Sequence, residues 1–370
     1  MRGILVQSLV SRGVSFDVAL ETANQIRDHV AAQGEVTTDD LSKLLQQVLG
    51  DRDDIDAPLL PPALPSPFVI DSRGSRTPFS KGMLAVSLQG AGIEPGDAYA
   101  VASELERRLL RSGCREIDRN ELRGLAADTI ERKFGERAAK RYRVWRRAAE
   151  DGRPIFLLVG GSTGVGKTSV AIEVARRLEI SRVIGTDSIR QIMRLMFSAD
   201  LMPEIHCSTY DAYRVLKPEA LGARDPVVAG FREQAQKIVV GVHALLDRAV
   251  DENTSILIEG VNVLPGVVAL DRYRTEAHVI CLVVAALDVE SYRNRFTTRA
   301  RKAQGRSADR YLEHFDAIIK IQSYILAEAE HYGIPIIDNV GFDAAVLSVT
   351  RSIISTLDKS MLSAEAQVEA

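Results

Sequence analysis

A glycine-rich segment near the middle of the chain has the residue types and the spacing of a phosphate-binding loop. Residues 161–168 read Gly-Ser-Thr-Gly-Val-Gly-Lys-Thr and match the pattern G-x-x-x-x-G-K-T. Glycines allow consecutive backbone N–H groups to converge on phosphate oxygens, where a Cβ would clash. Lys167 can reach the β- and γ-phosphates, and the Thr168 hydroxyl can bind Mg²⁺. The segment therefore predicts a site for a nucleoside triphosphate and Mg²⁺.

The residues on either side of the loop support this prediction. The apolar run 155–159 is typical of a buried strand, and Val170, Val174 and Leu178 form one face of a helix. The positive end of that helix adds to phosphate binding. We expect the nucleotide to contact Gly161, Ser162, Thr163, Gly164, Val165, Gly166, Lys167, Thr168 and Ser169.

Two carboxylates follow later apolar segments of strand length. Asp187 comes after the predicted strand 182–185, and Glu259 ends the predicted strand 255–259. In a parallel sheet both would lie at the edge where the loop is. Together with Lys167 they are our expected catalytic groups, and Glu259 with Thr168 is expected to serve the metal. Which carboxylate is the base stays open, and Asp187 can also be explained by its favourable place at a helix start.

Arginines crowd the segment after the fourth predicted strand: Arg293, Arg295, Arg299, Arg301 and Arg306. Phosphoryl transfer spreads negative charge over the γ-phosphate oxygens, and closing arginines stabilise it and exclude water. We expect such a lid here, with Arg299 as its catalytic member. A solvated basic helix face is the alternative.

A second set of polar residues lies between the second and third predicted strands. We expect Arg190, Arg194, His206 and Tyr210 to bind the acceptor. Guanidinium groups near one crevice suggest an anionic acceptor that already carries a phosphate. His206 is equally compatible with a core histidine bonded to backbone, and His206 with Cys207 lacks the further ligands of a metal site.

From residue 153 onward, strand-like and helix-like segments alternate, which predicts an α/β fold with a doubly wound, parallel, five-stranded sheet. The predicted strands are 155–160, 182–185, 255–259, 278–285 and 334–337. The predicted helices are 167–179, 187–197, 209–216, 227–251, 288–303, 309–331 and 342–357. We assign 151–358 to this domain, expect it to fold alone, and expect a flexible tail at 359–370.

The N-terminal part contains an internal repeat on either side of an acidic, proline-rich linker at 51–67. Both copies, 1–50 and 68–150, are predicted to be mostly helical. Only the second begins with a possible hairpin, at 68–79, and ends with a basic helix at 132–147. That helix fits a solvated surface with apolar anchors better than an RNA contact.

Composition narrows the function classes. The net charge is −3, so the chain has no overall positive charge that would attract nucleic acid. The three cysteines are far apart and odd in number, which argues against disulfides and a zinc site. The longest apolar run is too short for a bilayer, and we see no signal peptide. We expect a cytoplasmic protein with a small anionic phosphorylated partner, neither nucleic acid nor membrane, and a possible homo-oligomer.

Taken together, these motifs resemble the 2-phosphoglycerate kinase family of P-loop kinases. The likeness is carried by residues 158–168, 185–190, 206–210, 228–234, 258–261, 309–316 and 321–324. It implies a P-loop NTPase kinase fold and ATP-dependent phosphorylation of 2-phosphoglycerate to 2,3-bisphosphoglycerate. Asn262 stands where the family often has histidine. A kinase of another phosphorylated polyol, such as an inositol phosphate, or a non-catalytic nucleotide-dependent regulator remain alternatives.

The second N-terminal copy resembles an ATP-cone regulatory domain, which implies that mostly helical ATP-cone-like repeats precede the kinase. Such cones bind nucleotide through a basic pair on the first hairpin. Asp71 and Ser72 stand at the expected positions of that pair in this chain.

Overall fold

The computed structural model describes residues 21–22, 67–71, 74–217, 224–302 and 311–368, with the side chains of 298–302 and 362–368 left out. The first predicted repeat and the linker therefore lie almost entirely outside the described residues. Residues 67–370 belong to one compact unit, which is described below.

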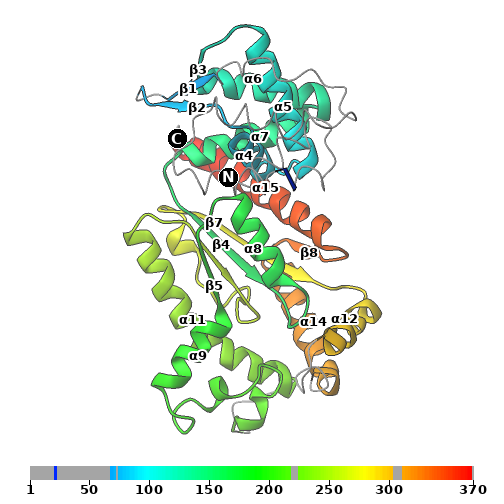
Figure 1. The fold of residues 1–370 in the computed structure, drawn as a ribbon. Coiled ribbons are helices and arrows are strands. Elements are labelled where there is room, and N and C mark those ends of the chain that lie inside the picture. The colour runs from blue at the N-terminus through cyan, green and yellow to red at the C-terminus, as the bar shows by residue number, and fades with distance from the viewer. Residues whose placement is uncertain (1–20, 23–66, 72–73, 218–223, 303–310, 369–370) are drawn as a thin grey trace, which may run out of the picture. The chain divides into compact units, whose positions relative to one another are not determined.

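A parallel sheet forms the centre of the C-terminal part (Figure 1). Its strands are β4 (Ile155–Gly160), β5 (Arg182–Gly185), β6 (Ile256–Glu259), β7 (His278–Ala285) and β8 (Ile336–Asp338), in the order β5-β6-β4-β7-β8. All four pairings are parallel, which confirms the predicted α/β fold and its five-stranded sheet. In the register, Val159 of β4 lies beside Glu259 of β6, so the end of each strand reaches the same edge.

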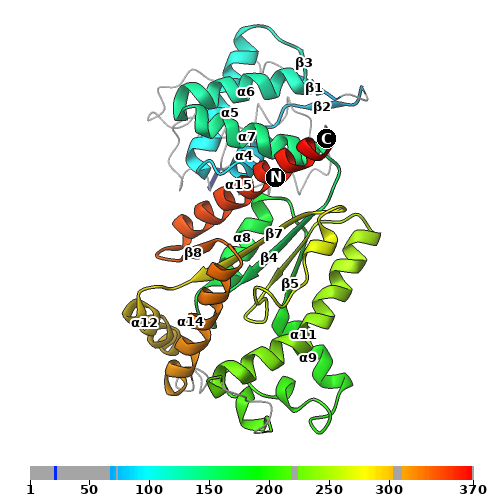
Figure 2. The same cartoon turned by 180° about the vertical axis from the view of Figure 1, so that it is seen from behind.

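Strand β4 is central because it is apolar on both sides. Its residues Leu157 and Val159 join the core that contains α8 (Lys167–Arg177) and α15 (Phe342–Val368). Phe156 and Leu158 point to the opposite core, with α9 (Thr186–Met196) and α11 (Pro226–Asp251); Figure 2 shows the molecule from behind. Continuous apolar runs are typical of strands covered by helices on both faces.

Two of the predicted helices, 209–216 and 309–331, differ from the structure. Residues 209–216 contain a 3₁₀ turn, Ala212–Val215, instead of an α-helix, preceded by another at Pro203–His206. A Cβ on Gly230 of α11 would lie 2.2 Å from the nitrogen of Tyr213, so the turn packs directly on the α11 backbone. The predicted helix 309–331 is interrupted by a turn at His314: residues 311–313 are helical, and α14 (Phe315–His331) follows the turn. Helix α12 (Val289–Lys302) precedes this segment in the chain.

Helix α15 continues to Val368, where the sequence predicts a flexible tail from 359. The buried side chains Leu357 and Met361 explain the longer helix, because they extend its apolar face past the predicted end.

The N-terminal domain of the unit is a small sheet covered by helices. The strands β1 (Phe68–Ile70), β2 (Arg76–Pro78) and β3 (Glu116–Asp118) have the order β2-β1-β3, and β1 with β2 forms the predicted hairpin. The helices are α4 (Lys81–Gly90), α5 (Pro95–Arg111), α6 (Arg119–Phe134) and α7 (Glu136–Glu150).

The single basic helix predicted at 132–147 is two helices. Gly135, with a φ of 81°, ends α6 and starts α7, and only glycine adopts such a conformation readily. Several of the basic side chains form ion pairs within this domain: Arg132 and Lys133 with Glu104, and Arg143 with Glu131. These ion pairs tie part of the basic surface to acidic side chains of the same domain.

The two domains share one hydrophobic core. Helix α15 packs against both α7 and α8, and α4 packs against α8. The buried Leu88 and Trp145 of the N-terminal domain belong to the same cluster as Val174 of α8. At the end of α8, Arg176 donates a hydrogen bond to Gln89 over 3.2 Å. The helix that begins at the phosphate loop therefore ends on the N-terminal domain.

Among the helices of the described residues, none combines the length and the apolar character that crossing a membrane requires.

Candidate active site

The glycine-rich loop follows β4 directly, and its glycines are required by its shape. Gly161, Gly164 and Gly166 have φ values of 141°, 84° and 89°. A Cβ on Gly161 would lie 2.2 Å from the Val284 carbonyl oxygen, and one on Gly164 would lie 2.4 Å from the Phe296 ring. This backbone presents N–H groups as an anion-binding concavity at the start of α8.

Side chains from later elements hold the loop. Tyr292 donates to the carbonyl of Thr163, and the side chains of Arg295 and Asn339 donate to the carbonyl of Val165 over 3.0 and 2.7 Å. Burial raises the pKa of Tyr292, which keeps its hydroxyl protonated as a donor. Arg295 was expected in the lid, and its guanidinium instead supports the loop backbone.

Lys167 lies across the loop, and its ammonium group donates to the carbonyl of Ser162 over 3.4 Å. The Ser162 hydroxyl in turn donates to the carbonyl of Ile318 over 3.2 Å. The loop is thus connected to α14 as well as to α12.

The two predicted carboxylates have different surroundings. Glu259 is buried, its Oε1 accepts a 3.0 Å hydrogen bond from Thr168, and its Oε2 is buried without a hydrogen-bond partner among the described residues. Asp187 is 73% exposed and forms a 2.9 Å ion pair with Arg190. One carboxylate therefore faces the loop helix, and the other faces the open side of the site.

A cavity of about 270 Å³ joins the loop to Asp187 and Arg190. It is lined by Thr163, Gly164, Gly166, Lys167, Thr168, Ser169, Asp187, Arg190, Ser208, Thr209, Tyr210, Val261 and Tyr311. The structure thus brings together six of the nine predicted loop residues with Asp187, Arg190 and Tyr210. Sequence reasoning did not select Ser208, Thr209, Val261 or Tyr311, although all four lie within motifs that carry the family likeness.

Aromatic rings form one wall of this cavity. The Tyr210 ring stacks on His314 at 4.7 Å and meets the edge of Tyr311 at 6.2 Å. These contacts fix Tyr210 at the border between the loop 206–210 and the segment before α14.

Seven predicted residues do not line the cavity: Gly161, Ser162 and Val165 of the loop, Glu259 at the end of β6, and Arg194, His206 and Arg299. Arg194 is exposed and donates to Gln191 over 3.3 Å. The His206 ring bonds to the carbonyl of Phe197 at 2.9 Å, which matches the alternative of a histidine tied to backbone. Arg299 lies in α12, and its side chain is outside the described part of the chain.

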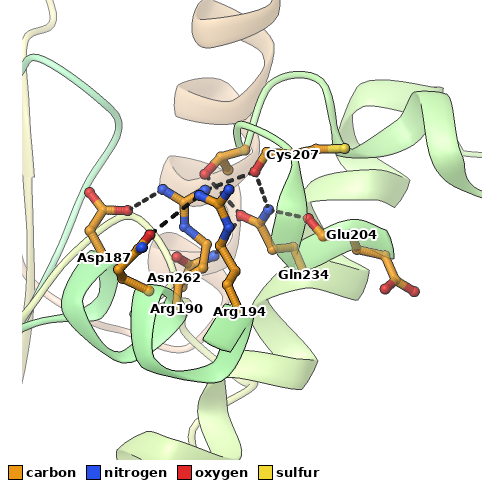
Figure 3. Close-up of polar contacts among 9 residues, drawn as sticks. Asp187, Arg190, Arg194, Glu204, Cys207, Gln234 and Asn262 are labelled. Carbon is orange, nitrogen blue, oxygen red and sulfur yellow. Dashed lines mark hydrogen bonds and ion pairs between the residues drawn. The ribbon is translucent and has the colours of Figure 1, made fainter. Parts of the chain in front are cut away.

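Arg190 lines the cavity and contacts two separate segments of the chain (Figure 3). Its Nη1 donates to the carbonyl of Cys207 over 2.8 Å, while its Nη2 contacts Asp187. The guanidinium therefore lies between the start of α9 and the segment 204–210.

Comparisons with known proteins show what this chain is similar to. Residues 67–151 match the ATP cone domain family. A 2-phosphoglycerate kinase from Pyrococcus furiosus is 37% identical, with 77% of this chain and 92% of that protein covered. One from Methanopyrus kandleri is 35% identical, with 78% and 88% covered. Among solved structures, a shikimate kinase from Bacteroides thetaiotaomicron is 15% identical, with 53% and 96% covered and a TM-score of 0.30.

Proposed function

The chain belongs to the 2-phosphoglycerate kinase family, and from that premise we propose that it transfers the γ-phosphoryl group of ATP to the free hydroxyl of 2-phosphoglycerate. The product would be 2,3-bisphosphoglycerate. The observation that carries this proposal is the cavity in which the phosphate loop meets Asp187 and Arg190. A nucleotide on the loop and an anionic acceptor beside Arg190 would there face each other.

The loop and Lys167 are proposed to bind the triphosphate. Phosphoryl transfer needs positioning and charge stabilisation more than covalent chemistry. Backbone N–H groups and one ammonium group supply both at the γ-phosphate. Arg299 on α12 remains a proposed lid residue, because the same helix already contacts the loop through Arg295.

Mg²⁺ fits the residues at the end of β6. The Thr168 hydroxyl and the Glu259 carboxylate are hard oxygen ligands of the kind Mg²⁺ prefers. The buried and unpartnered Oε2 of Glu259 is a further available oxygen. When bound, Mg²⁺ would neutralise phosphate charge.

Asp187 is the proposed general base. Glu259 is engaged by Thr168, whereas Asp187 lines the cavity and keeps one side exposed. A carboxylate there can accept the proton of the acceptor hydroxyl as that oxygen attacks the γ-phosphorus. Arg190, which holds Asp187, is proposed to bind an anionic group of the acceptor.

A cytoplasmic location is proposed as well. Cys114, Cys207 and Cys281 are free thiols, as expected in a reducing compartment.

The deciding experiment follows label from γ-³²P-ATP into acceptors. The protein is incubated with Mg·ATP and 2-phosphoglycerate, and separately with 3-phosphoglycerate and an inositol monophosphate. We expect the highest kcat/KM for 2-phosphoglycerate, with 2,3-bisphosphoglycerate identified by ³¹P NMR. A higher kcat/KM for another acceptor, or no transfer to any, would contradict the proposal.

A further inference from the structure

Gln234 of α11 uses every hydrogen-bonding capacity of its side chain (Figure 3). Its Nε2 donates to the carbonyls of Glu204 and Cys207 over 2.7 and 3.2 Å. Its Oε1 accepts from the Thr209 hydroxyl over 2.9 Å and from the Asn262 amide over 3.3 Å. A primary amide has two donor hydrogens and two acceptor lone pairs, so this one is saturated. The side chain is 0% exposed, so water cannot replace these partners.

Three of the four bonds hold one segment, residues 204–209. Ser208 and Thr209 of this segment, and Tyr210 after it, line the acceptor side of the cavity. A short stretch of 3₁₀ turn and loop has few hydrogen bonds of its own to fix it. The side-chain amide of Gln234 therefore supplies hydrogen bonds that fix this segment, as backbone hydrogen bonds fix a helix or a sheet.

Gln234 and Arg190 meet at the same carbonyl. The oxygen of Cys207 accepts from Gln234 Nε2 on one side and from Arg190 Nη1 on the other. Arg190 then contacts Asp187, the proposed base. A change at Gln234 would shift the Cys207 carbonyl and, through it, the guanidinium that is proposed to bind the acceptor.

Asn262 connects this hydrogen-bond network to the end of β6. It follows β6, three residues after Glu259, and it is 0% exposed. Because its amide donates to Gln234 and its side chain does not line the cavity, Asn262 acts through Gln234 and not on the acceptor.

We propose that Gln234 is a positioning residue that sets acceptor affinity in this kinase. The inference rests on the proposed function for the identity of the acceptor. None of the four hydrogen bonds of the Gln234 side chain goes to the phosphate loop, so ATP binding is expected to be independent of it. Loss of its amide removes one hydrogen bond from each of the carbonyls of Glu204 and Cys207 and one from the Thr209 hydroxyl, which loosens the segment.

The test compares Gln234→Leu with Gln322→Leu. Gln322 is a second buried glutamine, on α14; its Nε2 donates to the carbonyl of Ala286 over 2.9 Å, and its contacts are away from 204–210. Both variants lose a buried amide of the same size. We expect Gln234→Leu to raise the KM for 2-phosphoglycerate about tenfold, as the loss of one or two buried hydrogen bonds implies. Its KM for ATP should not change. Gln322→Leu should lower the thermal midpoint without changing the acceptor KM.

A parallel rise of both KM values in Gln234→Leu, or an unchanged acceptor KM, would overturn the proposal. Hydrogen exchange supplies an independent readout: amides of 204–210 should exchange faster in Gln234→Leu than in Gln322→Leu, and equal protection would overturn it too. If the wild-type protein does not phosphorylate 2-phosphoglycerate, the proposed function fails, while the exchange comparison still decides whether Gln234 positions the segment.

Discussion

The Thr168 hydroxyl donates a 3.0 Å hydrogen bond to Glu259, so two residues that are 91 positions apart in the sequence meet at the start of α8. Thr168 belongs to the phosphate loop helix, and Glu259 ends β6, the neighbour of β4. Glu259 therefore has a different partner from Asp187, which lines the cavity and forms an ion pair with Arg190. The two carboxylates therefore should respond differently to mutation.

Glu259→Gln and Asp187→Asn distinguish metal binding from base catalysis. Glu259→Gln should raise the Mg²⁺ concentration needed for half-maximal activity, because an amide oxygen is a weaker ligand than a carboxylate. Asp187→Asn should lower kcat by roughly 10²–10⁴ at saturating Mg²⁺, since it removes the proposed base. Activity is measured against Mg²⁺ concentration for both variants. A normal kcat in Asp187→Asn would assign the base elsewhere.

Lys167→Ala should reduce kcat by at least about a hundredfold while the fold survives, because one charge that stabilises the transferring group is lost. Steady-state kinetics and circular dichroism measure the two effects. Lys140→Ala is the matched control: Lys140 is a largely exposed lysine of α7, paired with Asp358. Full turnover in Lys167→Ala would exclude the proposed phosphate site.

The pH dependence of stability should contain a contribution from Glu173 on α8. The hydrogen bond from Arg176, with another from Arg177, lowers the pKa of Glu173 from 4.5 to about 2. A lowered carboxyl pKa in the folded state stabilises the protein above pH 4.5, and this stabilisation disappears as the pH falls towards 2. Glu173→Gln should therefore cost on the order of 1 kcal/mol at pH 7, because the partly exposed Arg176 is screened by solvent.

Urea unfolding at pH 7 and near pH 3 measures this difference, which should shrink at the lower pH. Glu276→Gln, at an exposed carboxylate, is the control and should have little effect at either pH. A difference between wild type and Glu173→Gln that stays constant with pH would contradict the assignment.

Removal of the N-terminal domain should destabilise the kinase domain, contrary to the expectation that 151–358 folds alone. Leu88 and Trp145 lie in one core with α8 and α15, and a buried side chain of this size contributes about 1.5–3 kcal/mol. We expect the fragment 151–370 to have a thermal midpoint roughly 5–10 °C below that of 67–370. Equal midpoints and no aggregation in light scattering would show that the shared core is dispensable.

The parts of the fold that sequence predicted are those encoded locally. The run 155–159 and the glycines after it specify a buried strand and a loop by themselves, so the sheet and the loop were found. The helix break at Gly135 was missed because good helix formers such as Glu, Arg, Lys and Ala flank this single glycine on both sides. The 3₁₀ turn at 212–215 was missed because it packs on the backbone of another helix at Gly230. Only the absence of a Cβ there allows the two backbones to approach so closely.

The same limit applies to the site. Lys167 and Asp187 follow strands, and strand ends can be located in the sequence. Gln234 lies in the interior of a long helix, where a polar residue is ordinarily solvent-exposed. Its partners Thr209 and Asn262 are 25 and 28 residues away, so only the folded chain shows that it is buried among them.

Helix α8 has one further consequence. Its 11 residues span about 16 Å, with the phosphate loop at one end and Gln89 of the N-terminal domain bonded at the other. A rigid rod of three turns transmits displacement almost undiminished. A substitution at Gln89 would therefore act on the far end of the same rod that carries the phosphate loop.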